Sequence, residues 1–145
     1  MVSAGFVNTT DIDTTASQNN IISTSTEIVS TSTIKTKTNS GVASKVKVYF
    51  SDAPIMQKIA YCESRNRQYS KDGSTLRGVV NSRDVGIFQV NEKYHLSDSK
   101  KMGIDIHTVD GNLEYARHLY ESQGTQPWSS SRPCWGNYEK LAINK

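Results

Sequence analysis

One carboxyl in this sequence, that of Glu63, falls where a helix would partly bury it. Ile55, Ile59 and Cys62 recur at the spacing of one helix face, and Glu63 lies in the last turn beside that apolar stripe. Burial raises a carboxyl pKa because it penalises the charged form, and the negative end of the helix dipole acts in the same direction. A carboxyl that keeps its proton near neutral pH is suited to general acid catalysis. Without its neighbours, Glu63 can also be interpreted as an ordinary exposed glutamate at a helix end.

A second group of polar residues lies in the segment that runs from Asp84 to Asn91. The apolar residues 85–90 predict a strand. On such a strand Gln89 and Asn91 project from one face, and Asp84 lies at the strand start, where a turn can re-aim it. Amide side chains both donate and accept hydrogen bonds, which suits sugar hydroxyls and N-acetyl groups. One acid on a helix, facing a carboxylate and amides, is a common arrangement for glycoside cleavage.

Further elements are expected around these residues. Asp52 is a candidate cap, and Pro54 a first-turn residue, of the helix that carries Glu63. Val79 and Val80 predict a short strand before the one described above. Helices are expected at residues 96–102 and 110–123, and Asp110 is the expected cap of the second.

The chain divides into two regions of different composition. Residues 1–45 are rich in Ser, Thr and Asn, and no aromatic residue occurs between Phe6 and Tyr49. Such a segment does not bury enough apolar surface to offset the entropy lost on ordering. We therefore expect a disordered stalk or linker, with a weak strand at residues 28–34 as the alternative. Residues 46–145 combine Tyr, Trp, Gly and periodic apolar positions, which predicts a folded domain.

Composition excludes several classes of protein. The net charge of +3 suits an anionic polymer, but it is far from the polybasic character of a nucleic-acid-binding protein. No apolar stretch is long enough for a membrane span, and no basic segment followed by an apolar one marks an export signal in the sequence as given. His95, His107 and His118 lack a metal-ligand spacing such as HExxH. We expect no metal or organic cofactor, because acid catalysis on sugars needs none.

The two motifs together resemble the lysozyme superfamily. The run Cys62-Glu63-Ser64, followed by the segment 84–91 with the sequence DVGIFQVN, is similar to animal-type lysozymes, in which Glu-Ser at a helix end precedes D-x-G-[IL]-[LF]-Q-[IV]-N. Bacterial lytic transglycosylases carry the related Glu-Ser and G-[LIV]-[MF]-Q. Resuscitation-promoting factors share Cys-Glu-Ser. The resemblance covers about residues 50–135. It implies an α+β, mainly helical, lysozyme-like domain with a small β-hairpin region.

The resemblance also implies a reaction. Glu63 matches the acid that protonates the β-1,4 glycosidic oxygen between N-acetylmuramic acid and N-acetylglucosamine in peptidoglycan. Asp84 stands where animal-type lysozymes have their second carboxylate, and its participation would make the reaction a hydrolysis. Without it, the N-acetyl group of the substrate assists and a 1,6-anhydro product leaves, as in lytic transglycosylases. Both outcomes stay open, and a non-catalytic saccharide-binding module on the same fold is the alternative from another class.

Four residues are expected to surround the saccharide. Ser64 matches the serine that supports the geometry next to the acid, and Gln89 and Asn91 match saccharide-contacting positions. Trp128 is either a platform for a pyranose ring or an aromatic residue of the core.

The sequence has two cysteines, Cys62 and Cys134, which are either two buried thiols or one disulfide. The disulfide of the resuscitation-promoting factors implies the pairing, which would tie the Glu63 helix to the C-terminal aromatic segment. A disulfide indicates an oxidising compartment. Together with the implied substrate, it leads us to expect a monomeric, extracytoplasmic protein whose partner is peptidoglycan.

Overall fold

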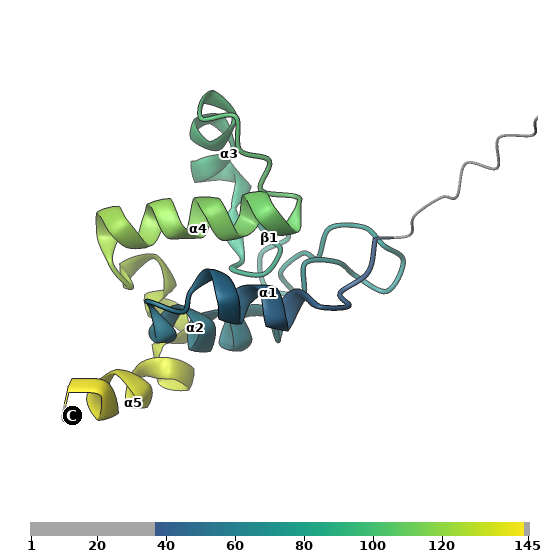
Figure 1. The fold of residues 1–145 in the computed structure, drawn as a ribbon. Coiled ribbons are helices and arrows are strands. Elements are labelled where there is room, and N and C mark those ends of the chain that lie inside the picture. Colours follow the sequence, from purple (N-terminus) through teal and green to yellow (C-terminus); the bar gives the residue numbers. More distant parts are fainter. Residues whose placement is uncertain (1–36, 144–145) are drawn as a thin grey trace, which may run out of the picture. The chain divides into compact units, whose positions relative to one another are not determined.

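The computed structural model describes residues 37–143, with side chains described as far as Tyr138 (Figure 1). Its elements, in chain order, are α1 (Val42–Tyr49), α2 (Pro54–Ser64), β1 (Asp84–Val85), β2 (Val90–Asn91), α3 (Glu92–Lys101), α4 (Val109–Gln123), the 3-10 helix η1 (Gln126–Ser131) and α5 (Arg132–Ile143). The expected α+β class, mainly helical with one small hairpin, is confirmed. The helix α1 begins inside the segment that the sequence assigned to a linker, and residues 1–36 of that segment lie outside the described residues.

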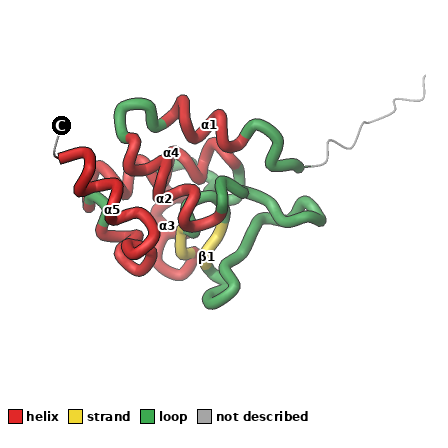
Figure 2. Tube along the Cα trace, turned by 90° about the horizontal axis from the view of Figure 1, so that it is seen from below, coloured by secondary structure: helices red, strands yellow, loops and turns green. Residues whose placement is uncertain are grey.

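The core lies between the helices and the hairpin. Its largest fully buried side chains include Phe50, Met56, Phe88, Leu113 and Tyr115, which come from helices α2 and α4, the end of α1 and the hairpin turn. Figure 2 shows the two short strands beside the helices, with loop segments next to them. The hairpin is thus held against a helical body instead of belonging to a larger sheet.

Helix α2 forms where the apolar spacing predicts it. Pro54 occupies the first turn, and Met56, Ile59 and Ala60 are buried on its inner face. The predicted cap is wrong: Ala53 holds the N-cap position, and no side chain caps the helix. Asp52 instead accepts two hydrogen bonds from Arg117 at 2.7 and 2.9 Å, because a bidentate guanidinium is a stronger partner than a backbone N–H.

The predicted strand at residues 85–90 is wrong. Two strands of two residues pair antiparallel, with Asp84 opposite Asn91, and a turn of residues 86–89 joins them. Two fully buried amides from elsewhere in the chain cause the difference. Gln68 accepts a hydrogen bond from the N–H of Ile87 and Asn112 from that of Phe88, so these backbone groups have side-chain partners in place of a strand ladder.

The predicted strand at Val79 and Val80 is also wrong. Both side chains are fully exposed, and the residues form a bend. The flanking residues take the available pairing, since the N–H of Gly78 donates to the carbonyl of Asp84 and Arg77 forms an isolated bridge with Val85.

The later helices follow the expected pattern with different starts. Helix α3 begins at Glu92, earlier than predicted, because the side chain of Asn91 caps it by accepting from the N–H of Lys93. Helix α4 is capped by Thr108, whose hydroxyl accepts from the N–H of Gly111, and not by Asp110. Asp110 instead pairs with Lys45 at 2.5 Å.

Helices α2 and α5 contact each other (Figure 1). The disulfide Cys62–Cys134 joins them. The predicted pairing is confirmed. In the part of the chain that the structure describes, no helix has the length and apolar character that crossing a membrane requires.

Candidate functional site

A polar cleft of about 340 Å³ opens where α2, the hairpin, α3, α4 and η1 meet. Its lining includes five residues that the sequence analysis placed in the site, and four of them are Glu63, Asp84, Gln89 and Asn91. Trp128 also borders the cleft. The structure therefore brings together residues from three separate parts of the chain.

Glu63 enters the cleft from the last turn of α2. The Ser131 hydroxyl donates a hydrogen bond to Glu63 Oε1 at 2.5 Å. Partial burial raises the pKa of Glu63, and the negative charge of Asp84 raises it further, whereas the hydrogen bond from Ser131 lowers it. Burial is the largest of these effects, so the pKa lies above its ordinary value. This carboxyl keeps its proton to a higher pH than an exposed glutamate does.

Asp84 faces the cleft from β1 with its carboxylate held by two amides. Asn91 Nδ2 donates to Asp84 Oδ1 at 2.6 Å, and Asn81 Nδ2 donates to the same oxygen at 3.4 Å. Asn91 therefore has two structural roles, because its side-chain oxygen caps α3 while its nitrogen orients Asp84. Asn91 borders the cleft, but both ends of its amide already have protein partners.

Gln89 occupies the hairpin turn, not a strand, with a φ of 49° in the left-handed region. Its Nε2 donates to the carbonyl of Gly86 at 2.8 Å, and its amide oxygen, which lies close to Gly78, has no hydrogen bond from the described residues. The residue lines the cleft. A left-handed backbone at a non-glycine residue is uncommon and often occurs at functional sites.

Ser64 and Trp128 lie deeper than Glu63. Ser64 is buried and does not line the cleft; its hydroxyl donates to the carbonyl of Ile87 at 2.8 Å and ties α2 to the hairpin turn. Trp128 is 4% exposed, and its indole nitrogen donates to the carbonyl of Phe88 at 2.9 Å. The ring thus packs in the core at the cleft floor, which is the second of its two interpretations.

Several site residues were not found from the sequence. Ser131, Asn81, Tyr94 and His95 touch the site residues or line the cleft, and Tyr94 is 66% exposed there. Serine and asparagine in a polar loop carry no signal that separates them from ordinary surface residues. Tyr94 lies in the first turn of α3, which the sequence analysis did not expect to be helical, so no signal marked it.

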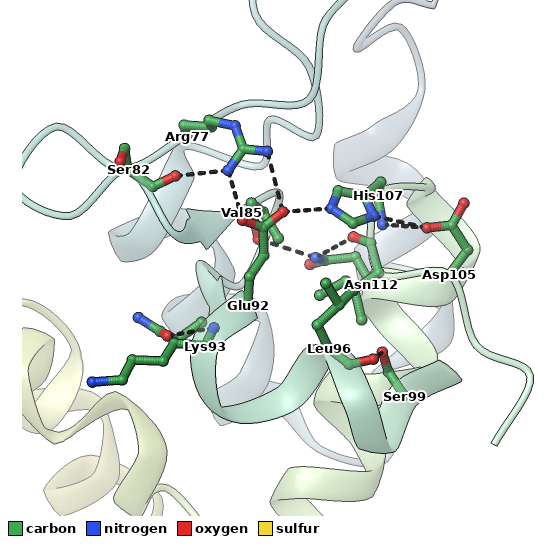
Figure 3. A network of polar contacts seen from close by, with 12 residues as sticks. Arg77, Ser82, Val85, Glu92, Lys93, Leu96, Ser99, Asp105, His107 and Asn112 are labelled. Atoms are coloured by element: carbon green, nitrogen blue, oxygen red, sulfur yellow. Dashed lines mark hydrogen bonds and ion pairs between the residues drawn. The ribbon is translucent and has the colours of Figure 1, made fainter. Parts of the chain in front are cut away.

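Figure 3 shows a network of polar contacts around Glu92, the first residue of α3. Arg77 makes a two-pronged contact with the carboxylate of Glu92, at 2.8 and 3.1 Å, and His107 Nε2 lies 2.7 Å from Glu92 Oε1. The other ring nitrogen of His107 contacts Asp105 at 2.9 Å. The hydrogen bonds from Arg77, more than those from His107, lower the pKa of Glu92 to about 2. This network connects the loop before β1 to the loop before α4.

No protein-family model, no curated protein and no solved structure matches this chain. The function of the cleft is therefore inferred from its own chemistry. Among the described residues, no three His, Cys, Asp or Glu side chains form a group that could hold a metal ion. The groups that do face the cleft are one carboxyl with a raised pKa, one carboxylate oriented by amides, and several amide and ring side chains.

Proposed function

We propose that this protein cleaves the glycan strands of peptidoglycan, with Glu63 as the general acid. The observation that carries the proposal is the partly buried Glu63 carboxyl with a raised pKa on a polar cleft. Bond cleavage at a glycosidic oxygen needs a proton on the leaving oxygen, and a carboxyl whose pKa is raised keeps that proton to a higher pH. The lysozyme-like motifs Cys62-Glu63-Ser64 and DVGIFQVN support the same assignment.

The rest of the cleft fits a sugar substrate. The Gln89 amide oxygen is suited to accept hydrogen bonds from sugar hydroxyls or an N-acetyl N–H. Asp84 is placed to stabilise positive charge that develops on the sugar ring, because its carboxylate is fixed at the cleft by Asn91. Tyr94 offers an exposed aromatic face, whereas Trp128 is too buried to serve as a platform.

Two products are compatible with this site. If Asp84 acts as a nucleophile or stabilises the cation that water then captures, the product has a reducing end. If the substrate's own N-acetyl group completes the reaction, the product is a 1,6-anhydro sugar, which is lighter by one water.

The surroundings of the reaction follow from the substrate. The disulfide Cys62–Cys134 is typical of proteins from an oxidising environment, and peptidoglycan lies outside the cytoplasm. We therefore place the protein in the cell envelope or the secreted fraction, acting as a monomer. Its net charge of +3 favours contact with an anionic wall polymer.

The test is a digestion of purified peptidoglycan by the wild type and by Glu63→Gln. The masses of the released muropeptides are measured by mass spectrometry. Glu114→Gln is the matched control, because it makes the same change on the exposed face of α4. We expect release by the wild type and the control, and a loss of about a hundredfold or more in Glu63→Gln, since the amide has no proton to give. Equal release by all three proteins contradicts the role of Glu63. Binding without release by any of them indicates a saccharide-binding module.

A further inference from the structure

Ser131, at the end of η1, makes three polar contacts through one hydroxyl. Its Oγ lies 2.5 Å from Glu63 Oε1 and 3.0 Å from the carbonyl of Trp128, and it accepts from the indole nitrogen of Trp135 at 2.8 Å. Ser131 and Glu63 are 68 positions apart in the sequence. This residue was not among those that the motifs singled out.

The contacts of Ser131 determine where its single proton goes. The indole N–H of Trp135 is a donor only, so it takes up one lone pair of the hydroxyl. The proton of Ser131 then has two acceptors, Glu63 Oε1 and the carbonyl of Trp128. The contact to Glu63 is the shorter, and the Trp128 carbonyl already accepts from the Trp135 indole at 3.2 Å. Ser131 is therefore oriented as a donor toward Glu63.

A fixed donor on one carboxyl oxygen decides which oxygen carries the acid proton. If Glu63 Oε1 were protonated, it would have to donate to Ser131, and the Ser131 proton would have to turn to Trp128. With Ser131 donating, the acid proton belongs on Oε2. Among the described residues, Oε2 has no hydrogen-bond partner, and Glu63 lines the cleft.

We propose that Ser131, held by Trp135, is the positioning residue of Glu63. Its hydroxyl donates a hydrogen bond to Oε1, so that the transferable proton of the acid lies on Oε2. The same hydrogen bond stabilises the carboxylate that remains after proton transfer. This inference rests on the proposed glycan cleavage. A hydrogen bond to an ionised carboxylate is stronger than one to a neutral acid. The contact from Ser131 therefore strengthens as the proton leaves Glu63 Oε2 for the glycosidic oxygen, and an interaction that strengthens toward the transition state accelerates the reaction.

A purely structural role for Ser131 predicts something different. A hydroxyl that only joined η1 to α5 would change the stability of the domain when removed, but not the ionisation of Glu63. The charge that faces Glu63 from the neighbouring hairpin is that of Asp84, and His95 borders the same cleft from α3. Neither of these changes in a Ser131 variant. The ionisation of Glu63 is thus the readout that separates the two roles.

The experiment compares the wild type with Ser131→Ala, Ser131→Thr and Ser129→Ala in the full chain. Ser129→Ala is the matched control, because Ser129 is exposed, lies in the same 3-10 helix and does not line the cleft that Glu63 enters. The first measurement is a carbon-13 NMR titration of glutamate carboxyls, in which the signal missing from Glu63→Gln identifies Glu63. The second is the rate of glycan cleavage as a function of pH. Thermal unfolding of each variant checks that it is folded.

We expect Ser131→Ala to raise the pKa of Glu63, because it removes the hydrogen bond that opposes burial and the Asp84 charge. We also expect a fall of about tenfold in the rate at its optimum, the usual effect of losing one hydrogen bond to a charged group. Ser131→Thr keeps the hydroxyl, so its titration and rate should return toward wild type. Ser129→Ala should match the wild type in both.

The outcomes separate this inference from the proposed function. A wild type that cleaves glycan, together with a Ser131→Ala variant unchanged in titration and rate, overturns the role of Ser131 and leaves the glycan cleavage standing. The same is true if Ser129→Ala shifts the titration as much as Ser131→Ala. A raised Glu63 pKa in Ser131→Ala alone, with no cleavage by the wild type, supports the Ser131 contact but overturns the proposed function. If Ser131→Ala does not fold, a Ser131→Thr variant that differs from wild type in both measurements also counts against the role.

Discussion

Asp84 acts on Glu63 through its charge as well as through its place in the cleft. Its negative charge is one of the two effects that raise the pKa of Glu63. Asn91 holds the Asp84 carboxylate by donating to it at 2.6 Å, and an asparagine at position 84 can accept the same hydrogen bond. The substitution Asp84→Asn therefore removes the charge and keeps the contact, which makes it a clean test of electrostatics.

We expect Asp84→Asn to shift the alkaline side of the pH–rate profile to lower pH. A general acid works only while it is protonated, so activity falls as the pH rises through its pKa. Removing a nearby negative charge lowers that pKa, and the fall begins earlier. The measurement is the pH dependence of muropeptide release, with Asp110→Asn as the control, because Asp110 pairs with Lys45 outside the cleft. An unchanged profile would contradict the electrostatic coupling. Complete loss of hydrolysis at every pH would assign Asp84 a direct chemical role.

At the scale of the elements, the hairpin turn depends on one glycine. Gly86 has a φ of 72°, and a Cβ built on it would lie 2.3 Å from the side-chain oxygen of Gln68 and 2.6 Å from the nitrogen of Asn112. Both amides are fully buried and hold the backbone of the turn. A side chain at this position would therefore push apart the groups that give the turn its shape.

We expect Gly86→Ala to lower the free energy of unfolding by about 3 kcal/mol, from the left-handed backbone and from the displaced buried amides. Gly103→Ala is the matched control, because Gly103 has nearly the same φ of 74° and open space around it. It should lose only about 1 kcal/mol, the backbone part of the effect. Urea unfolding measures both. Equal losses of unfolding free energy in the two variants would show that the buried amides move aside without destabilising the protein. The expected clash at position 86 would then not contribute to stability.

The charged network at the start of α3 should stabilise the protein by an amount that depends on pH. The pKa of Glu92 is lowered to about 2, so the stabilisation is fully present above the ordinary glutamate value near 4.5 and is lost as the pH falls toward 2. Because Arg77 is about half exposed and screened by solvent, we expect Glu92→Gln to cost about 1–2 kcal/mol at pH 7. Urea midpoints of the two proteins should converge below pH 4.5. Asp98→Asn, which breaks an exposed pair with Lys101, should change stability by less than about 0.5 kcal/mol. A Glu92→Gln variant as stable as the wild type at pH 7 would contradict the prediction.

The elements that were predictable from the sequence are those whose cause is local. Helix α2 follows from apolar residues on one face, and helix α4 from the same periodicity with Gly124 at its end. Caps were harder to predict, because a side chain such as Asp52 finds a stronger partner far along the chain in Arg117. The hairpin turn was missed because its shape is set by hydrogen bonds from Ile87 and Phe88 to Gln68 and Asn112. No local sequence pattern predicts these contacts.

The candidate site also contains residues with local signals and residues without them. Glu63, Asp84 and Gln89 were found because they belong to short motifs, and the structure places all three on one cleft. Ser131 was missed, because its role exists only when α5 and η1 return to α2. A residue that acts through another residue depends on the tertiary contact, so sequence motifs indicate the proposed acid Glu63 more readily than the group that contacts it.

At the scale of the whole molecule, the disulfide joins the helix that carries Glu63 to the helix that carries Trp135. Cys62 immediately precedes Glu63, and Cys134 immediately precedes Trp135, which orients Ser131. The bond therefore fixes the helix of the acid against the helix that supports its positioning residue. It also closes a loop with a sequence separation of 72 residues, which restricts the unfolded chain.

We expect reduction of this disulfide to lower the free energy of unfolding by about 4 kcal/mol, the value for a loop of this length in the chain-entropy model. Because Glu63 and Ser131 are then held only by non-covalent packing of α2 against η1 and α5, the rate of glycan cleavage should fall as well, even where the protein stays folded. Urea unfolding and muropeptide release are measured with and without reductant. The double variant Cys62→Ala, Cys134→Ala is the control: it should behave like the reduced wild type and should not respond to reductant. A reduced wild type with unchanged stability would mean that helix packing alone fixes the site. Lower stability with an unchanged cleavage rate would separate the role of the disulfide in folding from any role in catalysis.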